Sequence, residues 1–170
     1  MRLRDRSTLA SLDTSLDELE RRDLESAVPT TAGREGLELL RLADRVRSQA
    51  VRRLVLARDV EAHTALGFTT PTRWVAYGSG VSNAAASQTV EVIEFCRAHR
   101  LTGAAYQAGV IGFDHVLGLA RLCRGMDDTF NEHEAALLSM AERGDVDTFL
   151  SRVSQWRALI HAWGCYGGLS

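Results

Sequence analysis

The sequence predicts an all-α protein, in which one long N-terminal helix and several short helices joined by glycine corners form a single multi-helix domain. Apolar residues recur every three or four positions through most of the 170-residue chain, which is the period of a helix packed on one face. The chain contains only two prolines, the residue that interrupts helices most strongly. A short phrase of glycine, an apolar residue and the start of a helix also occurs three times, at 67–71, 80–84 and 109–113.

The length of the chain and its helix-breaking residues indicate how it is organised. A chain of 170 residues can bury a sizeable core in one domain but not in two large ones. We expect a loosely ordered N-terminal segment at 1–33, a helical domain at 34–163 and a tail at 164–170.

The N-terminal segment contains one helix signal and one linker signal. Ser15 and Glu18 form a capping box, which predicts a short helix from there to about Ala27. Residues 29–33, Pro-Thr-Thr-Ala-Gly, interrupt the periodicity and predict a linker.

A long helix is predicted from Arg34 to His63. Residues at spacings of three and four would form one continuous inward stripe: Leu39, Ala43, Val46, Ala50, Leu54, Ala57 and Val60. Such a helix spans about 45 Å at 1.5 Å per residue. It would therefore be the spine of the domain or pair with the same helix of a second copy.

Two capped helices follow around the second glycine corner. Thr70 with Pro71 at the first helical position predicts a helix to Tyr77. Ser82 predicts the cap of a helix that runs to about Arg100. A helix, a glycine turn and a second helix have helix-turn-helix geometry.

The second of these helices decides whether that corner could read DNA. Its first ten residues include Asn83, Ser87 and Gln88 but no arginine. Asn and Gln can pair with adenine, whereas phosphate neutralisation supplies much of the affinity for DNA. A DNA-reading corner and a plain helical corner both remain open.

Three more helices are predicted, at about 113–123, 129–142 and 146–163, the last capped by Asp145. Gly112 stands where a capping serine would be expected before the first of them. Their inward residues are expected to be Val116, Leu119, Ala120 and Cys123, then Ala136, Leu137 and Met140, then Val146, Phe149, Val153, Trp156, Ile160 and Trp163.

Charge is nearly balanced but unevenly distributed. The net charge of −2 argues against a general polyanion binder. Residues 34–60 hold seven arginines and four acids, whereas 125–148 hold seven acids and one arginine. Either one face is basic and another acidic, or the two segments attract each other within the fold. All 20 basic residues are arginine, which is typical of a GC-rich bacterial genome.

No pattern indicates a metal site, a cofactor or a catalytic centre. The three cysteines, Cys96, Cys123 and Cys165, are widely spaced, which excludes a zinc knuckle or a disulfide framework. Cys96 and Cys123 are expected to be small buried hydrophobes. The five histidines show no metal-ligand spacing, and His115 beside Asp114 near a helix start is expected to have a capping or a surface role and not a catalytic one.

No apolar run approaches the roughly 18 residues of a membrane span. No hydrophobic signal core is found near the N-terminus. We therefore expect a cytoplasmic protein without a membrane partner and without enzymatic activity.

Several segments together resemble a known family. They are the glycine corner at 67–74 followed by Val75-Ala76, the corner at 80–82 followed by Ala86, Ala108-Gly109 before Phe113-Asp114-His115, Glu134-Ala135-Ala136-Leu137, and Gln155-Trp156-Arg157. With the arginine-rich helix, the stretch 39–163 resembles the actinobacterial domain of unknown function 222, the thirteen-E-twelve repeat family. Members commonly precede an HNH endonuclease domain.

The resemblance implies a helical module beside a nuclease that handles DNA. Family members tend to carry arginine where this chain has Ser87-Gln88-Thr89, which removes phosphate contacts. The chain also contains no His-Asn-His metal centre. We expect an accessory half from a truncated, split or degraded gene.

These observations lead to two functional hypotheses. The first is a non-catalytic accessory module of an HNH endonuclease-like protein that contacts double-stranded DNA through Arg41, Arg45, Arg52, Arg53, Asn83, Ser87 and Gln88. The alternative is a protein-interaction or homodimerisation module without nucleic-acid contact. Its surface would include Trp156, Ile160 and Trp163, and its partner would be a second copy or a nuclease domain.

Overall fold

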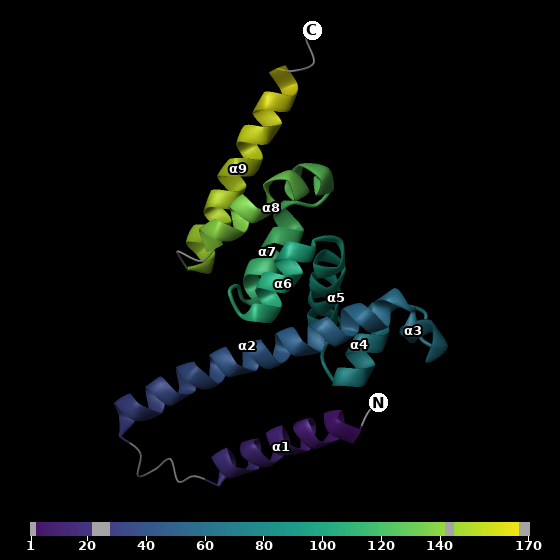
Figure 1. Ribbon diagram of the computed structural model, residues 1–170, viewed down its shortest axis with the longest axis vertical. Helices are drawn as coiled ribbons and strands as arrows, with labels where there is room; N and C mark the ends of the chain where they lie inside the picture. The colour runs from purple at the N-terminus through teal and green to yellow at the C-terminus, as the bar shows by residue number, and fades with distance from the viewer. Residues whose placement is uncertain (1–2, 22–27, 142–144, 167–170) are drawn as a thin grey trace. The chain divides into compact units, whose positions relative to one another are not determined.

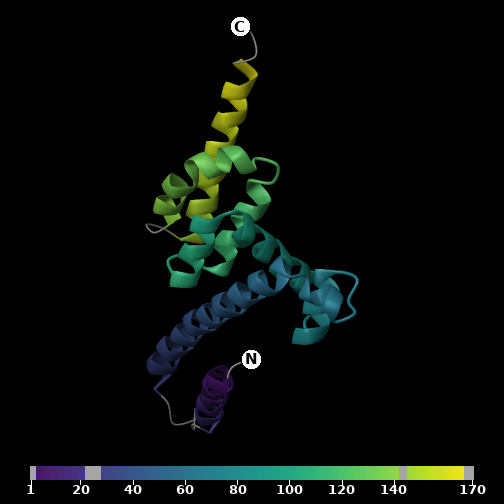
Figure 2. The ribbon, with the colours of Figure 1, turned by 45° about the vertical axis from the view of Figure 1, so that its right-hand side comes forward.

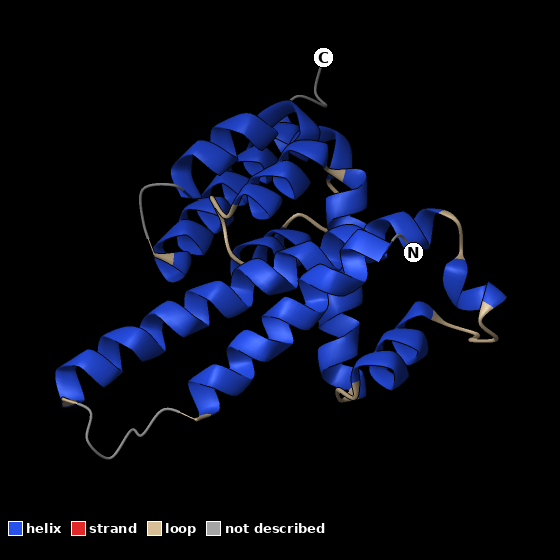
Figure 3. Cartoon of the chain, turned by 60° about the horizontal axis from the view of Figure 1, so that its bottom comes forward, coloured by secondary structure: helices blue, strands red, loops and turns tan. Residues whose placement is uncertain are grey.

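The computed structural model confirms the all-α class. It describes residues 3–21, 28–141 and 145–166, without the side chains of 3–6 and 163–166. Every regular element in these ranges is a helix (Figures 1 and 3). The helices are α1 (Leu3–Glu20), α2 (Pro29–Asp59), α3 (Ala62–Ala65), α4 (Pro71–Ser79), α5 (Asn83–Ala98), α6 (Arg100–Ala108), α7 (Phe113–Leu122), α8 (Asp127–Ala141) and α9 (Val146–Tyr166).

Contacts group the chain into two compact units, residues 1–41 and residues 42–170. In the first unit, α1 begins twelve residues before Ser15, so the expected helix start at Ser15 is wrong. The Ser15 hydroxyl instead donates to the Ser11 carbonyl one turn back, at 3.0 Å. Serine inside a helix often bonds this way, which competes with capping. Residues 22–27 of the expected helix lie outside the described residues.

The linker expected at 29–33 is also wrong, because α2 begins at Pro29. Proline is well suited to the first helical position, where its missing N–H would have no partner. The glycine at position 33 lies inside the helix at a place where an added Cβ would meet nothing within 4 Å. The glycine is therefore tolerated there and does not end the helix.

The inward stripe predicted for the long helix is largely exposed. Val46 and Val60 are 46% and 75% exposed, and Leu39 in the first unit is 41% exposed. The buried side chains of α2 are Ser48 and Val51, each 2% exposed. The spacing correctly identified an apolar face of the helix, but that face points to solvent. The face that packs on the domain is a different and narrower one, and it contains a serine. Periodicity alone does not show which face the domain covers.

The core of the second unit surrounds α5 and α7. Helix α5 packs against α4, α6 and α7, while α7 also packs against α9, and α8 contacts both α6 and α9 (Figure 2). The largest fully buried side chains include Tyr106, Leu119, Phe130, Leu137 and Phe149. Of the inward residues expected from α7 to α9, Ala136 is exposed, whereas Val116, Leu119, Cys123, Leu137, Phe149 and Val153 are buried.

The first two glycine corners have the local caps that the sequence predicts. Thr70 Oγ1 accepts from the Arg73 N–H at 3.3 Å, and Ser82 Oγ accepts from the Ala85 N–H at 3.2 Å. Gly80 ends α4 in the left-handed region at φ 69°, which favours glycine. Residues within the corner between α4 and α5 are thus sufficient to cap and end its helices.

The third corner receives its cap from α2. Both carboxylate oxygens of Asp44 lie 3.3 Å from the Phe113 nitrogen, whose N–H donates to them at the start of α7. An added Cβ on Gly112 would lie 3.0 Å from Asp44 Oδ2. Glycine at 112 therefore makes room for a carboxylate that replaces the missing serine. Arg47 lies beside it, with its guanidinium carbon 3.2 Å from the centre of the Phe113 ring.

Helix α6 is capped in the same way from α8. The Glu134 carboxylate, 5% exposed, accepts from the Thr102 N–H at 2.7 Å and from the Thr102 hydroxyl at 2.8 Å. One turn earlier on α8, Asn131 Oδ1 lies 2.8 Å from His99 Nδ1. Asp127 Oδ1 lies 3.3 Å from the other ring nitrogen of His99. One face of α8 thus holds the junction between α5 and α6.

Helices α7 and α9 approach closely at Gly118. An added Cβ there would lie 2.3 and 2.6 Å from the two methyl carbons of Leu150. We expect Gly118→Ala to destabilise the protein by about 1–2 kcal/mol, as overpacking does in a filled core. Gly78→Ala is the matched control, because nothing lies within 4 Å of its added Cβ and alanine favours a helix.

Urea unfolding measures the free energy of unfolding of both variants. A double-mutant cycle that combines Gly118→Ala with Leu150→Ala tests whether the collision with Leu150 is the cause. With Leu150 shortened, Gly118→Ala should no longer destabilise. A cost that persists in that background would contradict the proposed collision.

Because Asp44 caps α7, its removal should destabilise the protein. Asp44→Ala leaves the Phe113 N–H without its acceptor, so the free energy of unfolding should fall by about 1–2 kcal/mol. Asp114→Ala removes an exposed acid from the first turn of the same helix and should cost less, because it loses only the interaction with the helix dipole. Equal losses in urea unfolding would show that Asp44 acts through charge alone.

Candidate functional site

Two arginines of α2 lie free on its surface. Arg45 and Arg52 are seven residues apart, which places them on the same side of the helix, and both are exposed. Within the described residues neither forms an ion pair. Arg53 is also exposed, and its Nη1 donates to the Gln49 carbonyl at 2.9 Å. Arg41, likewise exposed, is the last residue of the first unit.

The corner between α4 and α5 has the expected helix-turn-helix connection but a mixed surface. Asn83 and Ser87 are exposed, whereas Gln88 is half-buried. The next turns of α5 carry Glu91 and Glu94. Their carboxylates pair with neighbouring arginines and so compete with phosphate groups for those charges.

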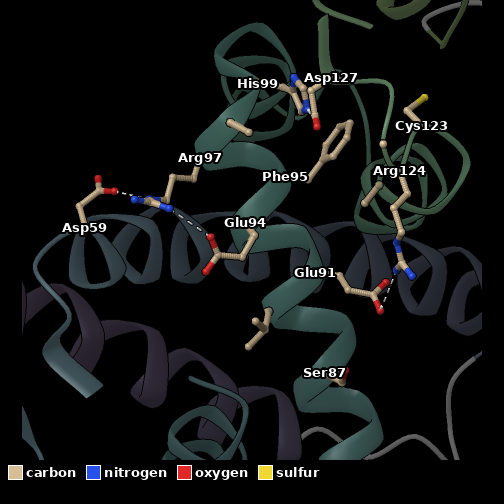
Figure 4. Close-up of a pocket in the computed structure, with 14 residues that line it drawn as sticks. Asp59, Ser87, Glu91, Glu94, Phe95, Arg97, His99, Cys123, Arg124 and Asp127 are labelled. Atoms are coloured by element: carbon tan, nitrogen blue, oxygen red, sulfur yellow. Dashed lines mark hydrogen bonds and ion pairs between the residues drawn. The ribbon is translucent and has the colours of Figure 1, made fainter. Parts of the chain in front are cut away.

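An open groove of about 820 Å³ runs along α5 in the second unit (Figure 4). Helix α5 forms its floor, the end of α2 contributes one side, and the turn between α7 and α8 contributes the other. Its lining residues are Asp59, Ser87, Val90, Glu91, Glu94, Phe95, Arg97, Ala98, His99, Ala120, Cys123, Arg124, Gly125 and Asp127.

Ion pairs neutralise the charges on the α2 side of the groove. Arg97 Nε lies 2.6 Å from Asp59 Oδ1, and its Nη1 lies 3.3 Å from Glu94 Oε2 (Figure 4). Arg58 Nε reaches the other oxygen of Glu94 at 2.6 Å. Hydrogen bonds to Asp59 and Glu94 raise the pKa of the Arg97 guanidinium.

On the α7 side one carboxylate, that of Glu91, lies beside two arginines and offsets only one of their charges. Arg121 Nε lies 3.1 Å from Glu91 Oε2, and Arg124 Nη2 lies 3.8 Å from Glu91 Oε1. The arginines around the groove therefore tie α5 to its neighbours. Arg45 and Arg52 on α2 differ from them because their charges remain available.

Burial keeps the two described thiols in their protonated form. Burial raises the pKa of the Cys96 thiol to about 12 and that of the Cys123 thiol to about 11, so both remain protonated at neutral pH. Both are buried, as expected, whereas the Cys165 side chain lies outside the described part. Among the described residues, no three His, Cys, Asp or Glu side chains are grouped as metal ligands.

Of the two roles expected for His115, a cap or a surface residue, the structure shows the cap. Its Nδ1 accepts from the Gly112 N–H at 3.2 Å, while Nε2 is buried without a partner in the described structure. Burial lowers the pKa of the imidazole. The neutral ring, with its proton on Nε2, is the form that can accept this bond.

Sequence reasoning missed the polar cluster on α8. His99 is 1% exposed and packs against the rings of Phe95 and Phe130, with centroid distances of 4.2 and 4.6 Å. Together with Asn131 and Glu134 it joins α8 to α6, so these residues have a structural role. A signal was available, because His99 precedes α6 without being able to cap it as Ser or Thr would.

The expected interface on α9 is only partly described. Trp156 is half-buried, packs against the core, and its ring centre lies 5.5 Å from that of His133. Ile160 is also half-buried. The side chain of Trp163 lies outside the described residues. Trp156 thus contributes to its own domain.

In the part of the chain that the structure describes, no helix is both long and apolar enough to span a membrane.

His115 predicts a pH dependence of stability. Because its folded pKa is lowered, the unfolded chain binds the extra proton first as pH falls below about 6.5, and folding weakens through that window. The contribution is fully present above that pH. We expect His115→Gln to flatten the decline in unfolding free energy between about pH 7.5 and pH 5.5. His161→Gln, on the exposed part of α9, should leave the decline unchanged, and an equal effect of both changes would exclude His115 as its source.

The comparisons with known proteins yield no relative. No family model, no curated protein and no solved structure matches the chain.

Proposed function

We propose that the chain is a non-catalytic helical module that binds the backbone of duplex DNA through α2. The observation that carries this proposal is the pair Arg45 and Arg52, exposed on one side of the helix without an ion pair among the described residues. Neutralising phosphates releases counterions, which favours binding without reading the sequence. The module would belong to the HNH endonuclease-associated kind that the sequence resembles.

Helix geometry supports contact with more than one phosphate. Seven residues at 1.5 Å per residue separate Arg45 and Arg52 by about 10.5 Å along the axis. Phosphate contacts of this kind position a protein on DNA, so we propose little sequence preference.

The helix-turn-helix corner is a weaker candidate for the contact. Asn83 and Ser87 could reach base edges, but Glu91 and Glu94 follow on the same helix. The arginines near them are already paired with carboxylates. We therefore assign the main contact to α2 and at most a flanking role to α5.

A second candidate is a protein-interaction module without DNA contact. The observation in its favour is the apolar surface at the end of α2, where Leu56 is 64% exposed and Val60, in the turn directly after the helix, is 75% exposed. DNA backbone offers no apolar surface to cover such residues, whereas another protein does.

A gel-shift titration with duplex DNA at several salt concentrations tests the first function. Arg45→Gln with Arg52→Gln should weaken binding at least about tenfold and lower the slope of log affinity against log salt by about 2. Arg121→Gln with Arg124→Gln removes the same charge from exposed but paired arginines and should have a smaller effect.

Absence of any shift for the native chain at low salt would reject DNA binding. Equal losses in the two double variants would reject α2 as the contact while leaving a general charge effect.

A further inference from the structure

The outer face of α2 repeats the spacing of a coiled coil. Within the second unit, six positions alternate at intervals of four and three residues, as the a and d positions of heptads do. We call these the seam: Leu42, Val46, Gln49, Arg53, Leu56 and, in the turn directly after α2, Val60. Its four apolar members are 43%, 46%, 64% and 75% exposed in chain order. Among the described residues the seam is thus an exposed face, about 21 Å long from Leu42 to Leu56 at 1.5 Å per residue.

This face lies opposite the side by which α2 joins its own domain. Val51, which is 2% exposed, projects into the core. At 100° per residue, the centre of the seam lies about 180° around the helix from Val51. A partner on the seam would therefore not displace α2 from its domain.

The order of apolar and polar residues along the seam is the same from either end. When a second α2 runs antiparallel, Leu42 faces Val60, Val46 faces Leu56, and Gln49 faces Arg53. Each apolar residue meets an apolar one, and the two polar positions meet each other. An interface with two-fold symmetry needs this self-complementarity.

The two flanks of the seam fit the same arrangement. Ala43, Ala50 and Ala57 follow one flank at seven-residue intervals, so two helices can approach closely there. The other flank carries Arg45, Arg52 and Asp59. In the antiparallel pair Arg45 faces Asp59 of the second copy, although Asp59 already binds Arg97. The two Arg52 side chains face each other, and salt screens their repulsion.

A parallel pair fits less well. It would place Arg53 against Arg53 within the seam, and like charges at a core position oppose association. From the antiparallel match we propose that the chain forms a homodimer through the α2 seam, with the two helices antiparallel and Gln49 opposite Arg53. This proposal does not depend on DNA binding, because the apolar seam residues contribute nothing to phosphate contact.

The oligomeric state tests the interface. Light scattering after size exclusion, over a range of concentrations, should show a species of twice the 18.7 kDa chain mass. Val46→Asn with Leu56→Asn should raise the dissociation constant at least about tenfold, since both 46–56 layers of the dimer lose both of their apolar side chains. Both residues are exposed in the monomer, so circular dichroism should show an unchanged fold. Arg45→Gln with Arg52→Gln should still dimerise, which separates this proposal from the DNA proposal.

Cysteine cross-linking tests the direction of the helices. In a Cys165→Ser background, Val46→Cys with Leu56→Cys should give an oxidised dimer, because position 46 faces position 56 of the second copy. Either single cysteine should remain largely uncross-linked. Cross-linking by the single variants would indicate a parallel pair and overturn the proposed register. A strictly monomeric native chain at high concentration, or an Asn variant that dimerises as well as the native chain, would overturn the interface itself.

Discussion

Two buried or half-buried carboxylates hold the second unit together by capping helices far from them in sequence. Asp44 of α2 accepts from the first N–H of α7, and Glu134 of α8 accepts from Thr102 in the first turn of α6. The unpaired N–H groups at a helix start are costly to bury without an acceptor. Each carboxylate therefore satisfies a helix end and fixes the position of the helix that carries it.

The Asp44 contact also determines what α2 offers to solvent. Asp44 and Arg47 engage the start of α7, and Ser48 and Val51 face the core. With that side fixed, the free arginines and the apolar seam must face outward. The cap that Asp44 forms on one side of α2 thus determines which residues α2 presents to solvent on its other side.

The sequence predicted what local chemistry determines. Thr70 and Ser82 cap the helices that follow them because the whole motif lies within four residues. Ser15 failed because a hydroxyl within a helix can bond backward as readily as it caps. The inward face of α2 was misassigned because burial there depends on helices that come later in the chain. The acids Asp44 and Glu134 could not be identified from spacing, although Gly112 and His99 marked helix starts whose first residue has no side-chain oxygen to act as a cap. The arginines of α2 were recognised in sequence, but their freedom from ion pairs depends on the tertiary structure.

The two long-range caps bear on the order in which the chain can acquire its structure. The partners of the α7 cap are 69 residues apart, and those of the α6 cap are 32 residues apart. Contacts between distant residues form only after long loops close, which slows folding. On the ribosome the α7 cap is available as soon as α7 emerges, because Asp44 has already been made. Helix α6 must wait for α8 to be synthesised, so its first turn is complete only late in translation.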